Sequence, residues 1–259
     1  MGSERYRLVT RSDFDGLVCA VLLEQLGMVR DILFVHPKDV QDGQVEIGPG
    51  DIATNLPYSP DAHLVFDHHR SETVRNATIA ANHIIDPDAP SAARVVYDYY
   101  GGAERFPSIA PDLMRAVDQA DSAQYSLEEV LAPNGWVLLN FLMDSRTGLG
   151  RFRDFRISNY QLMMQLIEAC QHHGIDEILQ LPDVRERVDL YHQQTAAFVA
   201  QLQRRHRRPD AVPRRRRPRQ RRHLPGAPRR RRPRCRRAGR PAERRHQDPG
   251  LGPPGPAPG

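Results

Sequence analysis

The sequence predicts an α/β fold in which a parallel sheet is flanked by helices. Two observations carry this prediction. Short apolar runs alternate with helix-length segments in the first half of the chain, and acidic residues lie at the ends of several of these runs. The 259 residues suffice for one large domain or two smaller ones. We expect an α/β domain at 1–160, a helical segment at 161–203 and a disordered Arg/Pro-rich tail at 204–259.

Four apolar runs indicate the strands of this sheet. They are residues 6–10 (YRLVT), 32–35 (ILFV), 51–55 (DIATN) and 63–66 (HLVF). Residues 16–26 indicate the first helix, which ends at Gly27, because glycine readily adopts the left-handed conformation of a helix end. Further helices are expected at 90–100, 111–120 and 136–143.

The segment after residue 160 is expected to be helical. Its apolar residues recur at a helical spacing. They are Leu162, Met163, Leu166 and Ile167, and later Val184, Val188, Tyr191, Phe198 and Leu202.

Charge is distributed very unevenly along the chain. Residues 204–259 contain 21 Arg and three acidic residues, a net charge of +18, whereas residues 1–203 carry −13. The tail also has twelve Pro and no Ile, Phe, Tyr, Trp or Met, so it lacks the residues for a core. An acidic body therefore precedes a strongly basic tail.

Two interpretations of this tail are open. A nucleic-acid arm would bind any polyanion without sequence specificity. We prefer an out-of-frame translation, because the body has one Lys (Lys38) and fifteen Arg, which indicates a GC-rich gene. Shifted GC-rich codons produce Arg, Pro, Ala and Gly.

Several classes of protein are disfavoured by composition. Cys19, Cys170 and Cys235 form no close pair, which argues against a disulfide or thiolate-zinc framework. No apolar run has transmembrane length, and the N-terminus lacks a signal-peptide pattern. We expect a cytoplasmic protein without a membrane partner; the sequence does not indicate an oligomeric state.

Three acidic motifs lie at the ends of the expected strands. "TRSDFDG" contains Asp13 and Asp15, "GDIATNLPY" contains Asp51, and "FDHHRSE" contains Asp67, His68 and His69. Ligands of α/β sheets bind at the carboxyl ends of the strands, so we expect these motifs to converge there. A fourth motif, "AVDQADSAQYS", places Asp118 and Asp121 on one face of a helix.

These residue types indicate a metal site. Carboxylates and imidazoles without thiolates suit Mn²⁺ or Mg²⁺. Several carboxylates are also what a centre of two ions needs to activate water against a phosphoester or phosphoanhydride. Each motif alone has a structural reading, as a turn, a helix cap or a solvated helix residue. Their conjunction favours the metal site.

These motifs together resemble the DHH phosphoesterase superfamily. "VTRSDFDGLVCAVLL", "HPKDVQDG", "DIATNLPY" and "FDHHRSE" resemble its exopolyphosphatase-related bacterial branch, over about residues 5–203. The resemblance implies a DHH domain whose substrate is a short oligonucleotide, a cyclic dinucleotide or polyphosphate.

The resemblance also implies roles for individual residues. It makes Asp13, Asp15, Asp51, Asp67, His68 and Asp121 metal ligands, with Asp118 as the alternative to Asp121. Asp67 would bridge or support the two ions. His69, with Asp67 and His68, would act in catalysis by positioning or protonating the oxygens of the scissile phosphate.

One position departs from the family pattern. Many members have a His two or four residues before the first Asp, where this chain has Arg11 and Val9. Either another group such as His36 replaces the imidazole, or that metal site is weak. Arg11 could instead face a substrate phosphate. "RTGLGRFRDFR", which contains Arg151, is either a phosphate-binding patch or a solvated surface.

The family normally continues into a second domain with a glycine-rich motif that grips the substrate, and the residues after 203 do not resemble it. We therefore expect a Mn²⁺- or Mg²⁺-dependent phosphoesterase with weak activity in this exact chain. The alternative is a non-catalytic protein that binds nucleic acid through its Arg-rich tail.

Overall fold

A parallel sheet forms the centre of the computed structural model, which describes residues 4–75, 78, 80–144 and 154–206. Within these residues the sheet has five strands in the order β2-β1-β3-β4-β5, and every neighbouring pair is parallel. The strands are β1 (Tyr6–Arg11), β2 (Val29–Val35), β3 (Asp51–Thr54), β4 (Leu64–Asp67) and β5 (His83–Ile85). The predicted α/β fold is confirmed.

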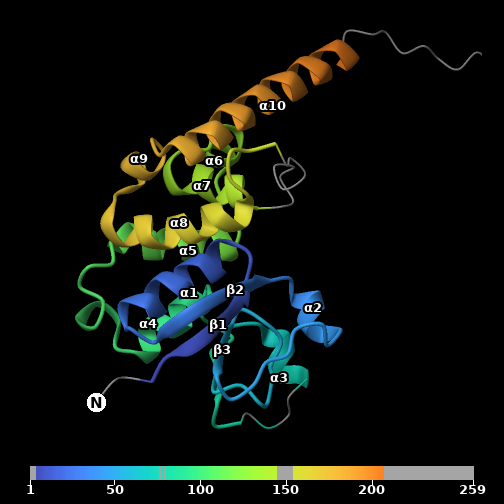
Figure 1. Ribbon diagram of the computed structural model, residues 1–259. Coiled ribbons are helices and arrows are strands. Elements are labelled where there is room, and N and C mark those ends of the chain that lie inside the picture. Colours follow the sequence, from blue (N-terminus) through green and yellow to red (C-terminus); the bar gives the residue numbers. More distant parts are fainter. Residues whose placement is uncertain (1–3, 76–77, 79, 145–153, 207–259) are drawn as a thin grey trace, which may run out of the picture. The chain divides into compact units, whose positions relative to one another are not determined.

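The larger core lies on one face of this sheet. It is built by α1 (Phe14–Gln25), α4 (Ala92–Tyr99), α5 (Pro111–Asp121), α7 (Gly135–Met143) and α8 (Asn159–His172). Leu8 of β1 faces this core, whereas the next residue, Val9, packs on the other face with Val35 and Leu56. That alternation is the normal period of a strand buried on both faces. Figure 1 shows α1 and α4 on one side of the sheet and α2 (Pro37–Gln41) and α3 (Arg70–Arg75) on the other.

Most predicted elements are confirmed with small shifts of their ends. The helix expected at 16–26 begins at Phe14 because Asp13 caps it. The short elements were not predicted. They are β5, α2, α3, η1 (Gly102–Glu104), α6 (Leu127–Leu131) and α9 (Ile175–Ile178). Elements of this length carry too few residues for a recognisable hydrophobic period.

The segment after residue 160 is helical as expected, in α8 and α10 (Pro182–His206). Leu162 and Leu166 of α8 share the core of α1. The chain divides into units at 1–209 and 210–259, and the described residues all lie in the first. The finer division at residue 160 stays a prediction.

Some predicted features lie outside the described residues. These are Arg151 with its neighbours Arg146 and Arg153, and the tail from residue 207. Arg156 of the same basic motif is described, and it pairs with the buried carboxylate of Asp183. Among the described residues, no helix combines the length and the apolar character needed to cross a membrane.

Candidate metal centre

The turn between β1 and α1 brings two aspartates to the carboxyl edge of the sheet. Asp13 caps α1, and its Oδ1 accepts a hydrogen bond of 2.9 Å from the Gly16 amide. A Cβ atom on Gly16 would lie 1.9 Å from the carbonyl oxygen of Arg11, so only glycine lets the helix start this close to the strand. Asp15 therefore enters the first turn of α1 facing the interior.

Asp15 is held by the N-terminus of α4. Its two carboxylate oxygens accept hydrogen bonds from the amides of Ala92, at 3.0 Å, and Ala93, at 2.8 Å. The side chain is only 2% exposed. The positive end of the helix dipole supports a negative charge at this position, and each oxygen keeps a lone pair for another partner.

Asp15, His68 and Asp121 form a cluster of possible metal ligands. One ligand atom from each residue lies within 4.8 Å of the ligand atoms of the other two. Among the described residues, this is the one group of three potential metal ligands that meets this distance. His68 Nδ1 is 3.2 Å from the carbonyl oxygen of Ala89. Because a carbonyl only accepts, the proton sits on Nδ1 and the neutral ring presents the lone pair of Nε2.

Asp67 and His69 form a second pair beside this cluster. Asp67 ends β4, and its Oδ1 lies 2.7 Å from His69 Nδ1 and 3.3 Å from the His69 amide nitrogen. The carboxylate accepts from the ring, so Nε2 of His69 is left for other partners. His69 lines the cleft described below. The contact with Asp67 raises the pKa of His69.

The protonation of the cluster reflects its crowded negative charge. Burial raises the pKa of Asp15 to about 8, and the charges of Asp121 and Asp13 act in the same direction. Burial disfavours the charged form of His68, but the contacts with Asp121 and the charge of Asp15 outweigh it and raise the pKa of His68 to about 9. Without a cation, protons compensate these carboxylates.

Two buried atoms test whether the residues fit a cation. Asp67 Oδ2 and His68 Nε2 have no hydrogen-bond partner among the described residues. His68 Nε2 is 2.9 Å from Asp121 Oδ2, an ion-pair distance, but without hydrogen-bond alignment. Buried carboxylate and imidazole atoms without donors are costly unless a ligand satisfies them. The residues therefore fit a divalent cation held by Asp15, His68 and Asp121.

A cleft of about 520 Å³ opens over this cluster. The order of the strands reverses between β1 and β3, which is where doubly wound sheets bind their ligands. Polar residues of several elements line the cleft. They are Arg11, Ser12, Asp13, Asp15, His36, His69, Asp121, Asn140 and Asp144.

The structure overturns the expectation for Asp51. Asp51 begins β3, so it lies at the amino edge of the sheet, opposite to the cleft. Its oxygens accept from Arg7 Nε at 2.8 Å, Arg7 Nη2 at 2.7 Å and the Gly48 amide at 2.8 Å. We correct the prediction that Asp51 is a metal ligand: it is a structural residue.

Asp118 and Asp121, the two alternatives for one metal ligand, have different contacts. Asp118 accepts from Ser91 Oγ at 2.8 Å and pairs with Arg94, so it fastens α5 to α4. Asp121, three residues later, contacts His68 instead.

His36 and Arg11 both line the cleft. His36 Nδ1 accepts from the Lys38 amide at 3.1 Å, so in the neutral ring Nε2 carries the proton. His36 is thus a donor rather than a metal ligand. Arg11 Nε is 2.8 Å from Asp13 Oδ2.

Sequence reasoning missed Asn55. This residue follows β3 directly, at the edge where Asp51 was expected. It is 1% exposed, its Nδ2 donates to Asp13 Oδ1 at 3.3 Å, and its Oδ1 has no partner among the described residues. Its φ of 55° is unusual for a residue other than glycine. The available signal was its place immediately after an apolar run.

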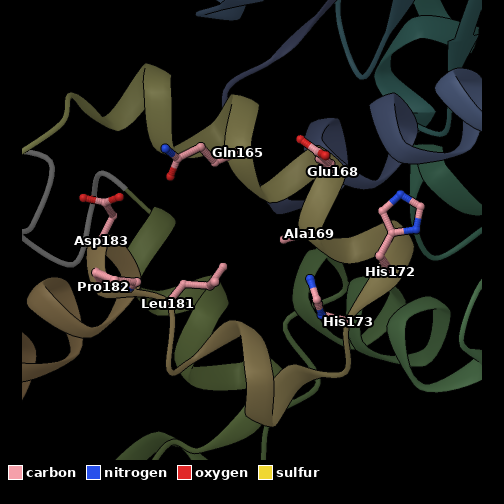
Figure 2. A pocket seen from close by; sticks show the side chains of 8 residues that line it. All are labelled: Gln165, Glu168, Ala169, His172, His173, Leu181, Pro182 and Asp183. Atoms are coloured by element: carbon pink, nitrogen blue, oxygen red, sulfur yellow. The ribbon is translucent and has the colours of Figure 1, made fainter.

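A second cavity lies away from the cleft (Figure 2). It measures about 340 Å³ and lies between α8 and the start of α10, with His172 and His173 at one side and Asp183 at the other. The described residues that line it include none of the predicted site residues.

Comparison with known proteins gives an informative relative among the solved structures. No family model and no curated protein matches this chain. Among solved structures, the pGpG-specific phosphodiesterase PggH from Vibrio cholerae is 60% identical, with a TM-score of 0.71. The match covers 77% of this chain and 64% of that one, so this chain spans less than two thirds of the relative's length.

This relative supports the phosphoesterase resemblance in its broad form. It does not support the exopolyphosphatase-related branch in particular. Over 77% of its length, the chain is similar in fold and sequence to a phosphodiesterase that acts on a dinucleotide.

Proposed function

We propose that this chain is the metal-binding part of a phosphodiesterase that hydrolyses short oligonucleotides of the pGpG type. The observation that carries the proposal is the cluster of Asp15, His68 and Asp121 under the cleft, beside the Asp67–His69 pair. The 60% identity to a pGpG-specific phosphodiesterase supports the dinucleotide over polyphosphate and cyclic dinucleotides.

The chain's own residues suggest how a phosphodiester would be attacked. Asp15, His68 and Asp121 would hold the cation, which supplies charge neutralisation and a more acidic water. His69 would move a proton through Nε2, because Asp67 fixes its ring by holding Nδ1. Arg11 and His36 would orient phosphate oxygens from the rim of the cleft.

The donor set favours Mn²⁺ or Mg²⁺. Carboxylate oxygens dominate the cluster, and the buried Cys19 is unsuited to ligation because burial raises the pKa of its thiol. A single imidazole among carboxylates suits Mn²⁺ somewhat better than Mg²⁺.

The test is hydrolysis of pGpG by the purified chain with Mn²⁺, alongside a linear tetranucleotide, a cyclic dinucleotide and polyphosphate. We expect turnover of pGpG that Asp15→Asn abolishes and Asp51→Asn leaves intact. Equal turnover by wild type and Asp15→Asn would reject the proposed centre. Faster release of phosphate from polyphosphate than cleavage of pGpG would reject the substrate class.

The C-terminal residues carry a separate prediction. If residues 204–259 are out of frame, a shifted reading frame of the DNA after codon 204 will encode an apolar strand. The purified chain will then hydrolyse pGpG only weakly. If the frame is clean and nucleic-acid binding disappears only when residues 204–259 are removed, the tail is a polyanion-binding arm.

A further inference from the structure

We propose that the cleft takes one divalent cation and that the guanidinium of Arg11 supplies the positive charge of a second ion. The proposal rests on the proposed function and departs from the two ions that the family resemblance implies. It follows from the unequal charges of two groups of residues, each of which contributes side chains to the wall of the cleft.

The first group, Asp15, His68 and Asp121, is suited to a cation. With a neutral imidazole it carries two negative charges, which match one divalent ion. Its ligand atoms lie within 4.8 Å of one another, and His68 Nε2 has no hydrogen-bond donor or acceptor aligned with it among the described residues. Among the described residues, the hydrogen bonds to Asp15 come from backbone amides, not from an arginine or lysine side chain that a cation would have to displace.

The second group, Arg11, Asp13 and Asn55, is already neutral. The carboxylate of Asp13 is 2.8 Å from Arg11 Nε through Oδ2, and its Oδ1 accepts from the Gly16 amide and from Asn55 Nδ2. Two of its roughly four acceptor positions therefore take hydrogen bonds, and Oδ2 is in ion-pair contact with the guanidinium. A cation at Asp13 would have to displace the guanidinium and would meet its charge directly.

The end of β3 adds no charge to this second group. Asn55 offers one neutral amide oxygen, whereas the acidic residue of that strand, Asp51, lies at the opposite edge in its pair with Arg7. Asp67 has one unpartnered oxygen, but its ligand atoms do not belong to the 4.8 Å cluster. Within this second group, an ion would thus find a neutral amide and a compensated carboxylate.

Arg11 is placed to bind an anion instead. Its side chain is 34% exposed and lines the cleft, and its Nε is 2.8 Å from Asp13 Oδ2. The remaining N–H groups of a guanidinium form a planar fork that matches two phosphate oxygens. Arg11 would therefore bridge Asp13 and a non-bridging oxygen of the substrate phosphate, opposite the single cation.

The test counts Mn²⁺ per full-length chain, by titration against the electron paramagnetic resonance signal of free Mn²⁺ and by metal analysis after gel filtration. We expect one ion in the wild type and in Arg11→Lys, which keeps the charge. Arg11→His removes the permanent charge and offers a ligand, so we expect a second ion and a spin-coupled Mn²⁺ signal. Circular dichroism checks that each variant is folded.

The outcomes separate this inference from the proposed function. Two Mn²⁺ ions in the wild type, with pGpG turnover, would overturn the inference and leave the function standing. One ion in both the wild type and a folded Arg11→His would show that Arg11 does not exclude the second ion, and would also overturn it. No Mn²⁺ binding to the wild type would reject the metal centre and the inference together.

Discussion

Asp51 and Asp67 are buried aspartates on neighbouring strands, and they differ in what surrounds them. Asp51 is 6% exposed at the start of β3, where a bidentate arginine and a backbone amide satisfy both oxygens. Asp67 is 1% exposed at the end of β4, with Oδ1 on His69 and Oδ2 without a partner among the described residues. A buried carboxylate with all its partners stabilises the fold, whereas one that lacks them indicates a ligand.

The largest expected effect comes from removing the negative charge of one of these two aspartates, Asp67. Asp67→Asn should lower kcat by on the order of 10³-fold, because the carboxylate that holds His69 is lost and the buried Oδ2 loses its charge. Asp51→Asn should leave kcat within about threefold and lower the free energy of unfolding by about 1–3 kcal/mol, because its partner Arg7 loses an ion pair at a partly exposed site. Steady-state kinetics and urea unfolding measure both. A kcat loss in Asp51→Asn comparable to that of Asp67→Asn would break the comparison.

The next effect concerns His69. His69→Gln keeps a hydrogen-bond donor toward Asp67 but removes the group that titrates, so kcat should fall by about 10²-fold, with Mn²⁺ affinity nearly unchanged. His68→Gln should instead weaken Mn²⁺ binding first, because Nε2 of His68 belongs to the cluster. If His69→Gln lowers Mn²⁺ affinity more than kcat, the two histidines have been assigned the wrong way round.

Asn55, like Asp67, has a buried side-chain oxygen without a partner among the described residues. Its substitution tests whether this oxygen also contributes to catalysis. Asn55→Gly keeps the left-handed backbone and removes only the amide, so we expect a loss of kcat of about tenfold with little change in stability. Asn55→Ala should show the same kinetic loss and an additional destabilisation of about 1 kcal/mol from its positive φ. Unchanged kcat in a folded Asn55→Gly would make Asn55 a purely structural turn.

The smallest effect is a pH dependence of stability in the metal-free protein. The folded-state pKa of Asp15 is raised from 3.8 to about 8, and that of His68 from 6.5 to about 9. The stability linked to a raised pKa is complete below the unfolded-state value and is lost as pH rises through the folded-state value. The Tm should therefore fall by a few degrees between about pH 6 and 9.

A bound cation replaces those protons, so the Mn²⁺-induced rise in Tm should grow over the same pH interval. Differential scanning fluorimetry with and without Mn²⁺ measures both trends, and Asp15→Asn is the control that should flatten them. A Tm of the metal-free protein that rises with pH would contradict the raised pKa values of Asp15 and His68.

Much of the fold could be predicted because its signals are local. Four of the five described strands and the main helices follow from apolar runs and helical spacing. The strand β5 has only three residues, "HII", and was missed. The placement of Asp13, Asp15 and Asp67 at the carboxyl edge also follows from local order, since each comes at or after the end of an apolar run.

The error at Asp51 has a simple geometric cause. A strand advances about 3.3 Å per residue, so the two ends of even a four-residue strand point to opposite edges of the sheet. The motif "DIATN" has a polar residue at each end. The prediction of a metal ligand falls on Asp51 because it is the acidic one. The side chain at the correct end, Asn55, is neutral.

By itself the sequence determined the strands and the residues that end them, because the periodicity of side chains and the chemistry of turns act over a few residues. Only the tertiary structure decided which polar side chains meet. The docking of α5 on α4 gives Asp118 to Arg94 and leaves Asp121 to His68. Contacts between different helices and strands, such as these two, depend on how the elements pack, and no local pattern carries that information.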